Sequence, residues 1–130
     1  WFGSPSYGGD CKVADVQPII ESLVFPNLDY LGLRNSEFAD EIAEAIVKSP
    51  LIETISVIDL SLGHLSDKGA EFLLNCSGIN ELDILNVSEA LLSEEMVSKL
   101  SKLDCRLFAD KQGTDYDHYD EEERYCAVTE

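Results

Sequence analysis

An acidic run near the C-terminus, DYDHYDEEE over residues 115–123, is the densest group of potential ligands in the chain. Calcium takes several oxygen ligands, so carboxylates at this density could hold it. The run lacks the central glycine and the pair of flanking helices that an EF-hand loop needs. We therefore predict no metal and no cofactor, and we interpret the run as a solvated loop that opposes aggregation. A cation-binding or regulatory module built on this loop is the alternative hypothesis.

The two histidines are the other residues that could support catalysis. His64 falls between a predicted strand and a predicted helix, and His118 falls within the acidic run. Neither has a Ser or Cys nucleophile at a recognisable spacing, and the chain has no GxSxG motif, phosphate-binding loop or metal-ligand cluster. We therefore predict that the protein is not an enzyme and that both histidines are structural.

The four cysteines are far apart in the sequence and have neither the CxxC pattern nor the spacing of a zinc site. Buried thiols in a cytosolic protein are the favoured interpretation, because a repeat core does not need covalent crosslinks. Cys105 and Cys126 both lie in strand-like stretches, so the sequence leaves a disulfide between them open. The other two are Cys11 and Cys76.

Acidic residues outnumber basic ones, 26 against 9, which gives a net charge of −17. Such a chain repels phosphate backbones, so we predict no binding to nucleic acid. No apolar run approaches about 18 residues, so no membrane association is predicted, and a cytoplasmic location is expected. The charge serves either solubility or attraction to a basic protein partner, and the sequence leaves both open.

The elements that would position these residues repeat along the chain at an interval of 27 residues. In each unit, an apolar pattern with the period of a strand is followed by one with the period of a helix. Six apolar columns keep the same interval through three units, which indicates a repeat protein. The columns are Leu28, Ile55 and Leu82; Leu31, Ile58 and Leu85; Leu33, Leu60 and Val87; Phe38, Leu65 and Leu92; Ala43, Ala70 and Val97; and Ile46, Leu73 and Leu100.

Each unit is predicted to begin with a strand of pattern LxxLxL and to continue with a helix. The strands are expected over residues 28–33, 55–60 and 82–87, and the helices over residues 39–49, 66–76 and 93–103. Ser66 and Ser93 are suited to cap the N-termini of two helices. Gly69 lies inside a helix, where it costs about 1 kcal/mol relative to Ala. We expect close packing at that position to explain it.

The whole chain, residues 1–130, is interpreted as one domain. It comprises a partial first unit over residues 10–24, three units over residues 25–51, 52–78 and 79–104, and a C-terminal cap with the acidic loop over residues 105–130. A strand is expected after Lys102 and a short final one at RYCAV. Alternating strands and helices require parallel strands joined by right-handed crossovers. The predicted fold is an α/β right-handed β-α solenoid, with the strands on its concave face and the helices on its convex face.

The strands LDYLGL, ISVIDL and LDILNV, each followed by a helix in a 27-residue unit, resemble leucine-rich repeats of the ribonuclease-inhibitor-like subclass. Over residues 25–130, the stretches LDYLGLRNSEFADEIAEAIVKSP, VIDLSLGHLSDKGAEFLL, LLSEEMVSKLSKL and ERYCAVTE are similar to the C-terminal half of an uncharacterised bacterial family of leucine-rich-repeat proteins. The resemblance implies the fold and carries no activity. One departure is the turn column, which usually holds Asn and here holds Ser36, Gly63 and Ala90. We expect the turn backbone to bond to water or to itself instead.

Residues that alternate with the core columns are expected to form exposed rows across the concave face. One row, Tyr30, Val57 and Ile84, is more apolar than a solubilising surface requires, which favours a protein-binding patch with a polar rim. Packing of these side chains against a C-terminal segment is the alternative. The predicted function is a noncatalytic protein-protein interaction scaffold with an unknown partner. The predicted binding residues are Tyr30, Arg34, Val57, Asp59, Ile84, Asn86 and Ser88.

Overall fold

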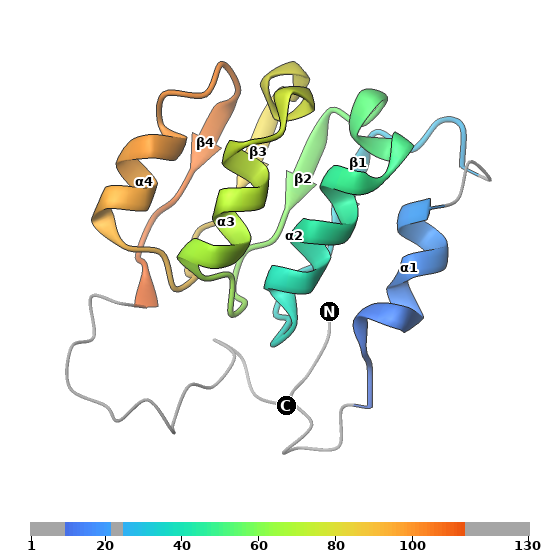
Figure 1. Ribbon diagram of the computed structural model, residues 1–130, viewed down its shortest axis with the longest axis horizontal. Coiled ribbons are helices and arrows are strands. Elements are labelled where there is room, and N and C mark those ends of the chain that lie inside the picture. Colours follow the sequence, from blue (N-terminus) through green and yellow to red (C-terminus); the bar gives the residue numbers. More distant parts are fainter. Residues whose placement is uncertain (1–9, 22–24, 114–130) are drawn as a thin grey trace.

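The fold is α/β, with four parallel strands in the order β1-β2-β3-β4 and a layer of helices on one face of the sheet (Figure 1). It is seen in a computed structural model that describes residues 10–21 and 25–113. The strands are β1 (Tyr30–Gly32), β2 (Val57–Asp59), β3 (Ile84–Asn86) and β4 (Arg106–Phe108). The helices are α1 (Val13–Glu21), α2 (Ala39–Lys48), α3 (Asp67–Leu74) and α4 (Glu94–Leu100). The opposite face of the sheet, which we call the open face, carries no described helix.

The register of the sheet follows the interval seen in the sequence. Tyr30 pairs with Val57 and Val57 with Ile84, so the first three strands are each 27 residues apart (57 − 30 = 27). The step to β4 is shorter, because Ile84 pairs with Arg106 (106 − 84 = 22). The prediction of a strand after Lys102 is confirmed. The three earlier strands are confirmed too, although each is shorter than the six residues predicted.

The core lies between the sheet and the helices. The central residue of each of the first three strands, Leu31, Ile58 and Leu85, is buried against the helix layer. The helices contribute Ile46, Leu73 and Leu100, all of them fully buried. Burial of apolar surface of this kind contributes roughly 25 cal/mol for each Å² removed from water. The predicted columns therefore form one continuous core across the units.

The N-terminal end of this core is less completely covered. Ile19 in α1 is 40% exposed, although the residue 27 positions later, Ile46, is fully buried. Helix α1 lies beyond β1, at the end of the helix row (Figure 1). The buried hydroxyl of Ser49 donates a hydrogen bond to the carbonyl oxygen of Ile20, which ties α2 to α1. Within the described ranges no strand pairs with the outer side of β1, so part of α1 faces solvent.

Two 3-10 helices, which the sequence interpretation missed, connect helices to strands. They are η2 (Pro50–Glu53), between α2 and β2, and η3 (Ser77–Glu81), between α3 and β3. Ser49 accepts a hydrogen bond of 3.1 Å from the backbone N–H of Leu51 and so caps η2. Proline is tolerated in the first turn of a helix because it has no N–H to leave unpaired there. Pro50 and Ser77, which directly follow the two predicted helices, thus begin short helices of their own.

The turn after each strand contains one residue with a left-handed backbone. These residues have φ angles of 56° at Asn35, 66° at Leu62, 54° at Glu89 and 52° at Lys111. The first three lie one position before the small turn residues noted in the sequence, Ser36, Gly63 and Ala90. Asn adopts this conformation more readily than Leu or Glu.

The backbone of these turns bonds to the neighbouring turn. The N–H of Asn35 donates to the carbonyl of Ser61 at 3.0 Å, and the N–H of Leu62 donates to that of Ser88 at 3.0 Å. In the turn column itself, the carbonyl oxygen of Ser36 accepts from the N–H of His64 at 2.9 Å, and that of Ala90 accepts from the N–H of Gly113 at 2.6 Å. The expectation that turn backbone groups bond to one another is therefore confirmed. Gly63 is needed for the close approach, because a Cβ there would lie 2.8 Å from the carbonyl oxygen of Ser36.

The N-termini of successive helices are linked by side chains. Both the N–H and the hydroxyl of Ser66 donate to the carboxylate of Asp40, at 2.8 and 2.6 Å. Ser93 donates to Asp67 in the same way, at 2.9 and 2.6 Å. The predicted capping roles are confirmed, since Ser66 and Ser93 also accept hydrogen bonds from N–H groups in their own helices. The Asp–Ser links also bond each cap to the preceding helix.

Gly69 in α3 lies against the start of α2. A Cβ at this position would lie 2.8 Å from the Cα of Asp40, closer than real Cβ contacts allow. Close packing therefore explains the glycine, as expected from the sequence. The approach of the two helices brings Asp40 within reach of Ser66.

Several sequence predictions fall on residues outside the described ranges. They are the acidic run, His118, Cys126, the final strand at RYCAV and most of the predicted C-terminal cap. In the part of the chain that the structure describes, no helix combines the length and hydrophobicity needed to cross a bilayer.

Candidate functional site

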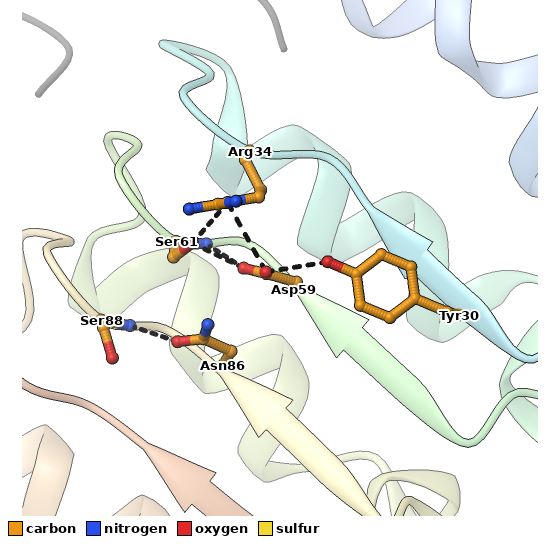
Figure 2. A network of polar contacts seen from close by, with 6 residues as sticks. All are labelled: Tyr30, Arg34, Asp59, Ser61, Asn86 and Ser88. Atoms are coloured by element: carbon orange, nitrogen blue, oxygen red, sulfur yellow. Dashed lines mark hydrogen bonds and ion pairs between the residues drawn. The ribbon is translucent and has the colours of Figure 1, made fainter. Parts of the chain in front are cut away.

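The rows predicted from the sequence lie across the open face in the order expected. Tyr30, Val57, Ile84 and Arg106 are successive partners in one row. Gly32, Asp59, Asn86 and Phe108 form the next row toward the carboxyl ends of the strands. The structure thus brings together all seven predicted binding residues, because Arg34 and Ser88 lie two residues after the ends of β1 and β3. Figure 2 shows the polar part of this surface.

Asp59 is the centre of the polar network. The sequence interpretation placed it among the exposed residues, but the structure buries it. It is only 6% exposed. Its carboxylate accepts hydrogen bonds from the backbone N–H of Ser61 at 3.0 Å, the hydroxyl of Ser61 at 2.6 Å and the hydroxyl of Tyr30 at 3.0 Å (Figure 2). A buried carboxylate is tolerated when its oxygens are satisfied in this way. The prediction that Asp59 is exposed is wrong because neighbouring side chains cover its carboxylate.

Tyr30 is 52% exposed, whereas Val57 and Ile84 in the same row are half-buried. Its ring leans along β1 toward the next strand, and a Cβ at Gly32 would lie 2.9 Å from the ring carbon Cε1. Partial burial and the hydrogen bond to Asp59 raise the pKa of the Tyr30 phenol above its ordinary value, and the nearby Arg34 opposes this shift. The phenol therefore remains protonated and continues to donate to Asp59 at neutral pH.

Arg34 closes the network from the other side. Its Nε donates to the hydroxyl of Ser61 at 3.0 Å and lies 3.5 Å from the carboxylate of Asp59. Its side chain is 42% exposed, so the ion pair is partly screened by water and contributes modestly to stability. The position of Arg34 is therefore fixed by the same carboxylate that holds Tyr30.

The next strand repeats part of this arrangement without the charge. The N–H of Ser88 donates to the side-chain oxygen of Asn86 at 3.1 Å, as the N–H of Ser61 does to Asp59. The hydroxyl of Ser88 accepts a hydrogen bond of 3.2 Å from the N–H of Asp110, beyond β4. Both predicted residues thus fix the turns that border the open face.

The apolar part of the open face extends further than the sequence predicted. Val57 and Ile84 are half-buried in the middle of the sheet. Phe108 on β4 is 40% exposed, and its neighbour Arg106 is exposed as well. The sequence interpretation missed these two residues because β4 departs from the 27-residue interval. The alternation in LDCRLFAD was the signal that could have found them.

A row of exposed carboxylates borders this surface at the amino ends of the strands. Asp29 and Asp83 directly precede β1 and β3, and Asp104 lies two residues before β4. We call these three residues the acidic margin. Asp29 accepts a hydrogen bond from the hydroxyl of Ser56, so its position is fixed relative to β2. The open face therefore combines an apolar centre with negative charge on one side.

Among the described residues, no group of three His, Cys, Asp or Glu side chains is arranged to hold a metal ion. His64 lies half-buried in the turn before α3, and its Nε2 has no hydrogen-bond partner within the described part of the chain. On the helix side, a shallow groove of about 500 Å³ lies between α2 and the end of α3. Its lining includes Val47, Phe72 and Cys76.

One solved structure is similar to this chain over most of its length. It is the crystal structure of a protein from Bacteroides fragilis, with 28% sequence identity and a TM-score of 0.77. The match covers 86% of this chain and 33% of the other, so the chain corresponds to about a third of that protein. No family model matches the sequence, and none of the curated proteins does either.

Proposed function

We propose that the chain is a right-handed leucine-rich-repeat solenoid that acts as a noncatalytic protein-interaction scaffold. In this proposal the open face is the concave surface, the helices are on the convex side, and the open face binds the partner. The constant spacing of β1, β2 and β3 supports the solenoid. Repeat proteins of this kind use extended concave surfaces for binding.

The observation that carries the binding proposal is the row formed by Tyr30, Val57 and Ile84. These side chains are in register on a face that no described element covers, and Tyr30 is fixed by Asp59. A fixed aromatic side chain with an apolar neighbour is typical of the energetic centre of an interface. Holding it in place before binding reduces the entropy that association must remove.

The proposed partner is a protein with a basic surface. The net charge of −17 and the acidic margin favour attraction to Lys and Arg side chains. Such attraction raises the rate of association and weakens as salt increases. The apolar row would keep part of the affinity at high salt, because burial of apolar surface does not depend on screening.

The experiment compares partner capture from native cells by the wild-type protein and by a variant with Tyr30→Glu and Ile84→Glu. The matched control carries Gln17→Glu and Ser98→Glu, which add the same charge at exposed positions on the helices. The proposal predicts loss of partners with the open-face variant and retention with the control. Equal capture by both variants, with circular dichroism showing both folded, would remove the open face as the binding site.

A further inference from the structure

We propose that the partner segment on the open face is a basic amphipathic helix that lies across the strands. Its apolar side chains would rest on Val57 and Ile84, and its Lys or Arg side chains would face the acidic margin. The inference depends on the proposed function, because it names the class of ligand for the same surface. It rests on three features of the described residues: backbone pairing, the direction of the apolar row and charge.

Backbone pairing favours a helix over an extended segment. In the middle of the sheet, β2 and β3 are each hydrogen-bonded to strands on both sides. Their faces therefore offer side chains and no free N–H or C=O groups. An extended chain lying there would leave its own backbone groups without protein partners, whereas a helix satisfies them internally.

The apolar row runs across the strands, and this sets the length of the helix. Neighbouring strands lie about 4.8 Å apart, so the distance from β1 to β4 is roughly 14 Å. A helix rises about 1.5 Å per residue and needs roughly ten residues to cover that distance. Apolar side chains three or four residues apart would meet Val57 and Ile84, with one end of the helix at Tyr30 and the other beside Arg106.

Charge fixes the composition of the helix. Asp29 and Asp83 flank the apolar row on one side, so basic side chains are favoured there. The exposed ring of Tyr30 adds a surface over which a cation can stack. Arg34 does not oppose this arrangement, because its charge is paired with Asp59. The exposed Arg106 at the β4 end of the row disfavours a basic side chain there, so the Lys or Arg residues belong at the other end of the helix and along the acidic margin.

The test uses three labelled peptides of about 18 residues that are built on Leu, Ala and Lys and have the same number of Lys residues. One places Leu at the spacing of an amphipathic helix, one is a scrambled sequence, and one carries a central proline that breaks the helix. Fluorescence anisotropy with the full chain measures affinity at low and high salt. The inference predicts that the amphipathic peptide binds at least about tenfold more tightly than the other two. It also predicts that Tyr30→Ala with Ile84→Ala removes this difference while Ser98→Ala does not.

Equal affinity for all three peptides would show attraction by charge alone and would overturn the inference. Binding that Tyr30→Ala with Ile84→Ala leaves unchanged would place the peptide elsewhere and would overturn it too. Hydrogen exchange on the free chain tests whether the face is already covered. Protection in residues 114–130 that the same two substitutions abolish would identify an internal segment as the occupant and overturn the inference.

The outcomes separate this inference from the proposed function. If partner capture depends on Tyr30 and Ile84 but no amphipathic peptide binds, the face binds protein by another type of element and only the helix assignment fails. If capture is unaffected by the open-face substitutions, the proposed function fails and the helix assignment fails with it.

Discussion

The hydroxyl of Tyr30 on β1 donates a hydrogen bond of 3.0 Å to the carboxylate of Asp59 on β2. The bond runs diagonally across the sheet, because Tyr30 pairs with Val57 and Asp59 pairs with Gly32. A Cβ at Gly32 would lie 2.9 Å from the ring carbon Cε1 of Tyr30, so the glycine leaves room for the ring on this path. One glycine, one aspartate and one tyrosine thus hold an exposed aromatic side chain in a single position. An anchor that is already ordered loses less conformational entropy when a partner binds.

The coupling between these two residues can be measured directly. We expect Tyr30→Phe to lower the free energy of unfolding by about 1 kcal/mol, because it removes the donor to a charged acceptor at a half-exposed site. Asp59→Asn should cost about 1–3 kcal/mol, because it weakens several bonds at once. Urea denaturation of the single and double variants gives the coupling energy. Strictly additive effects would contradict the hydrogen bond.

The titration of Tyr30 provides a second check. Its pKa is raised by burial and by Asp59, so Asp59→Asn should lower it toward the ordinary value of about 10. Ultraviolet absorbance of tyrosinate, with Tyr30→Phe as the reference, isolates this group from the other tyrosines. A pKa of Tyr30 that is the same with and without the Asp59 carboxylate would contradict the assignment.

The direction of the same shift predicts how stability changes with pH. The folded state keeps the phenolic proton at pH values where the unfolded state has released it. The free energy of unfolding should therefore fall as pH rises from about 10 to the folded pKa of Tyr30. In Tyr30→Phe this part of the decline should be absent, which denaturation at a series of pH values can test.

The Asp–Ser links between helices should contribute to stability. Asp40→Ala removes the acceptor of two hydrogen bonds from Ser66 and should cost about 1–3 kcal/mol. Glu41→Ala is the matched control, because Glu41 is exposed in the same first turn of α2. Both changes remove one acidic side chain near the positive end of the helix dipole. Equal losses in the two variants would show that the dipole and not the link carries the effect.

Gly69→Ala should reverse the usual effect of this substitution. In an exposed helix interior, alanine stabilises by about 1 kcal/mol relative to glycine. At Gly69 the added Cβ would meet the Cα of Asp40 at 2.8 Å, so we expect a net loss of about 1–3 kcal/mol. Ser98→Ala at an exposed position of α4 should change stability by less than about 0.5 kcal/mol. Thermal unfolding compares the two variants, and a stabilised Gly69→Ala protein would contradict the packing of α3 on α2.

The described cysteines should react in the order of their exposure. Cys11 is exposed, Cys76 is half-buried and Cys105 is buried. Burial raises the pKa of the Cys105 thiol, which lowers the fraction of reactive thiolate. Alkylation of the native protein, followed by mass spectrometry of its peptides, should modify Cys11 first and Cys105 last. Loss of this order in urea would confirm that the fold causes it, and early modification of native Cys105 would contradict its burial.

Much of the architecture was predictable because periodic apolar residues determine which side chains enter the core. Columns such as Leu31, Ile58 and Leu85 gave the strand register, and Ser66 and Ser93 gave two helix starts. The step to β4 was not predictable from the same interval, because it is five residues shorter. Arg106 and Phe108 were therefore missed as members of the open face.

The details of the site depend on contacts that have no sequence period. The alternation of residues placed Asp59 on the open face, but its burial results from Tyr30 and Arg34 reaching over from the neighbouring strand. Likewise, the role of Asp40 depends on a serine 26 residues away in the next helix. Both the burial of Asp59 and the hydrogen bonds of Asp40 depend on side chains from a neighbouring unit, which the apolar pattern within one unit does not reveal.

The Asp–Ser links have the same spacing as the strands, and this bears on how such a chain can change in length. Removal of residues 40–66 would join Ala39 to Asp67, and the new neighbours would match those of the original chain in strand, turn and helix phase. Between α2 and α4, where both Asp–Ser links lie, a deletion of another size would move the acceptor carboxylate out of line with the next serine. Genetic duplications or deletions should therefore be tolerated when they add or remove whole multiples of one 27-residue unit.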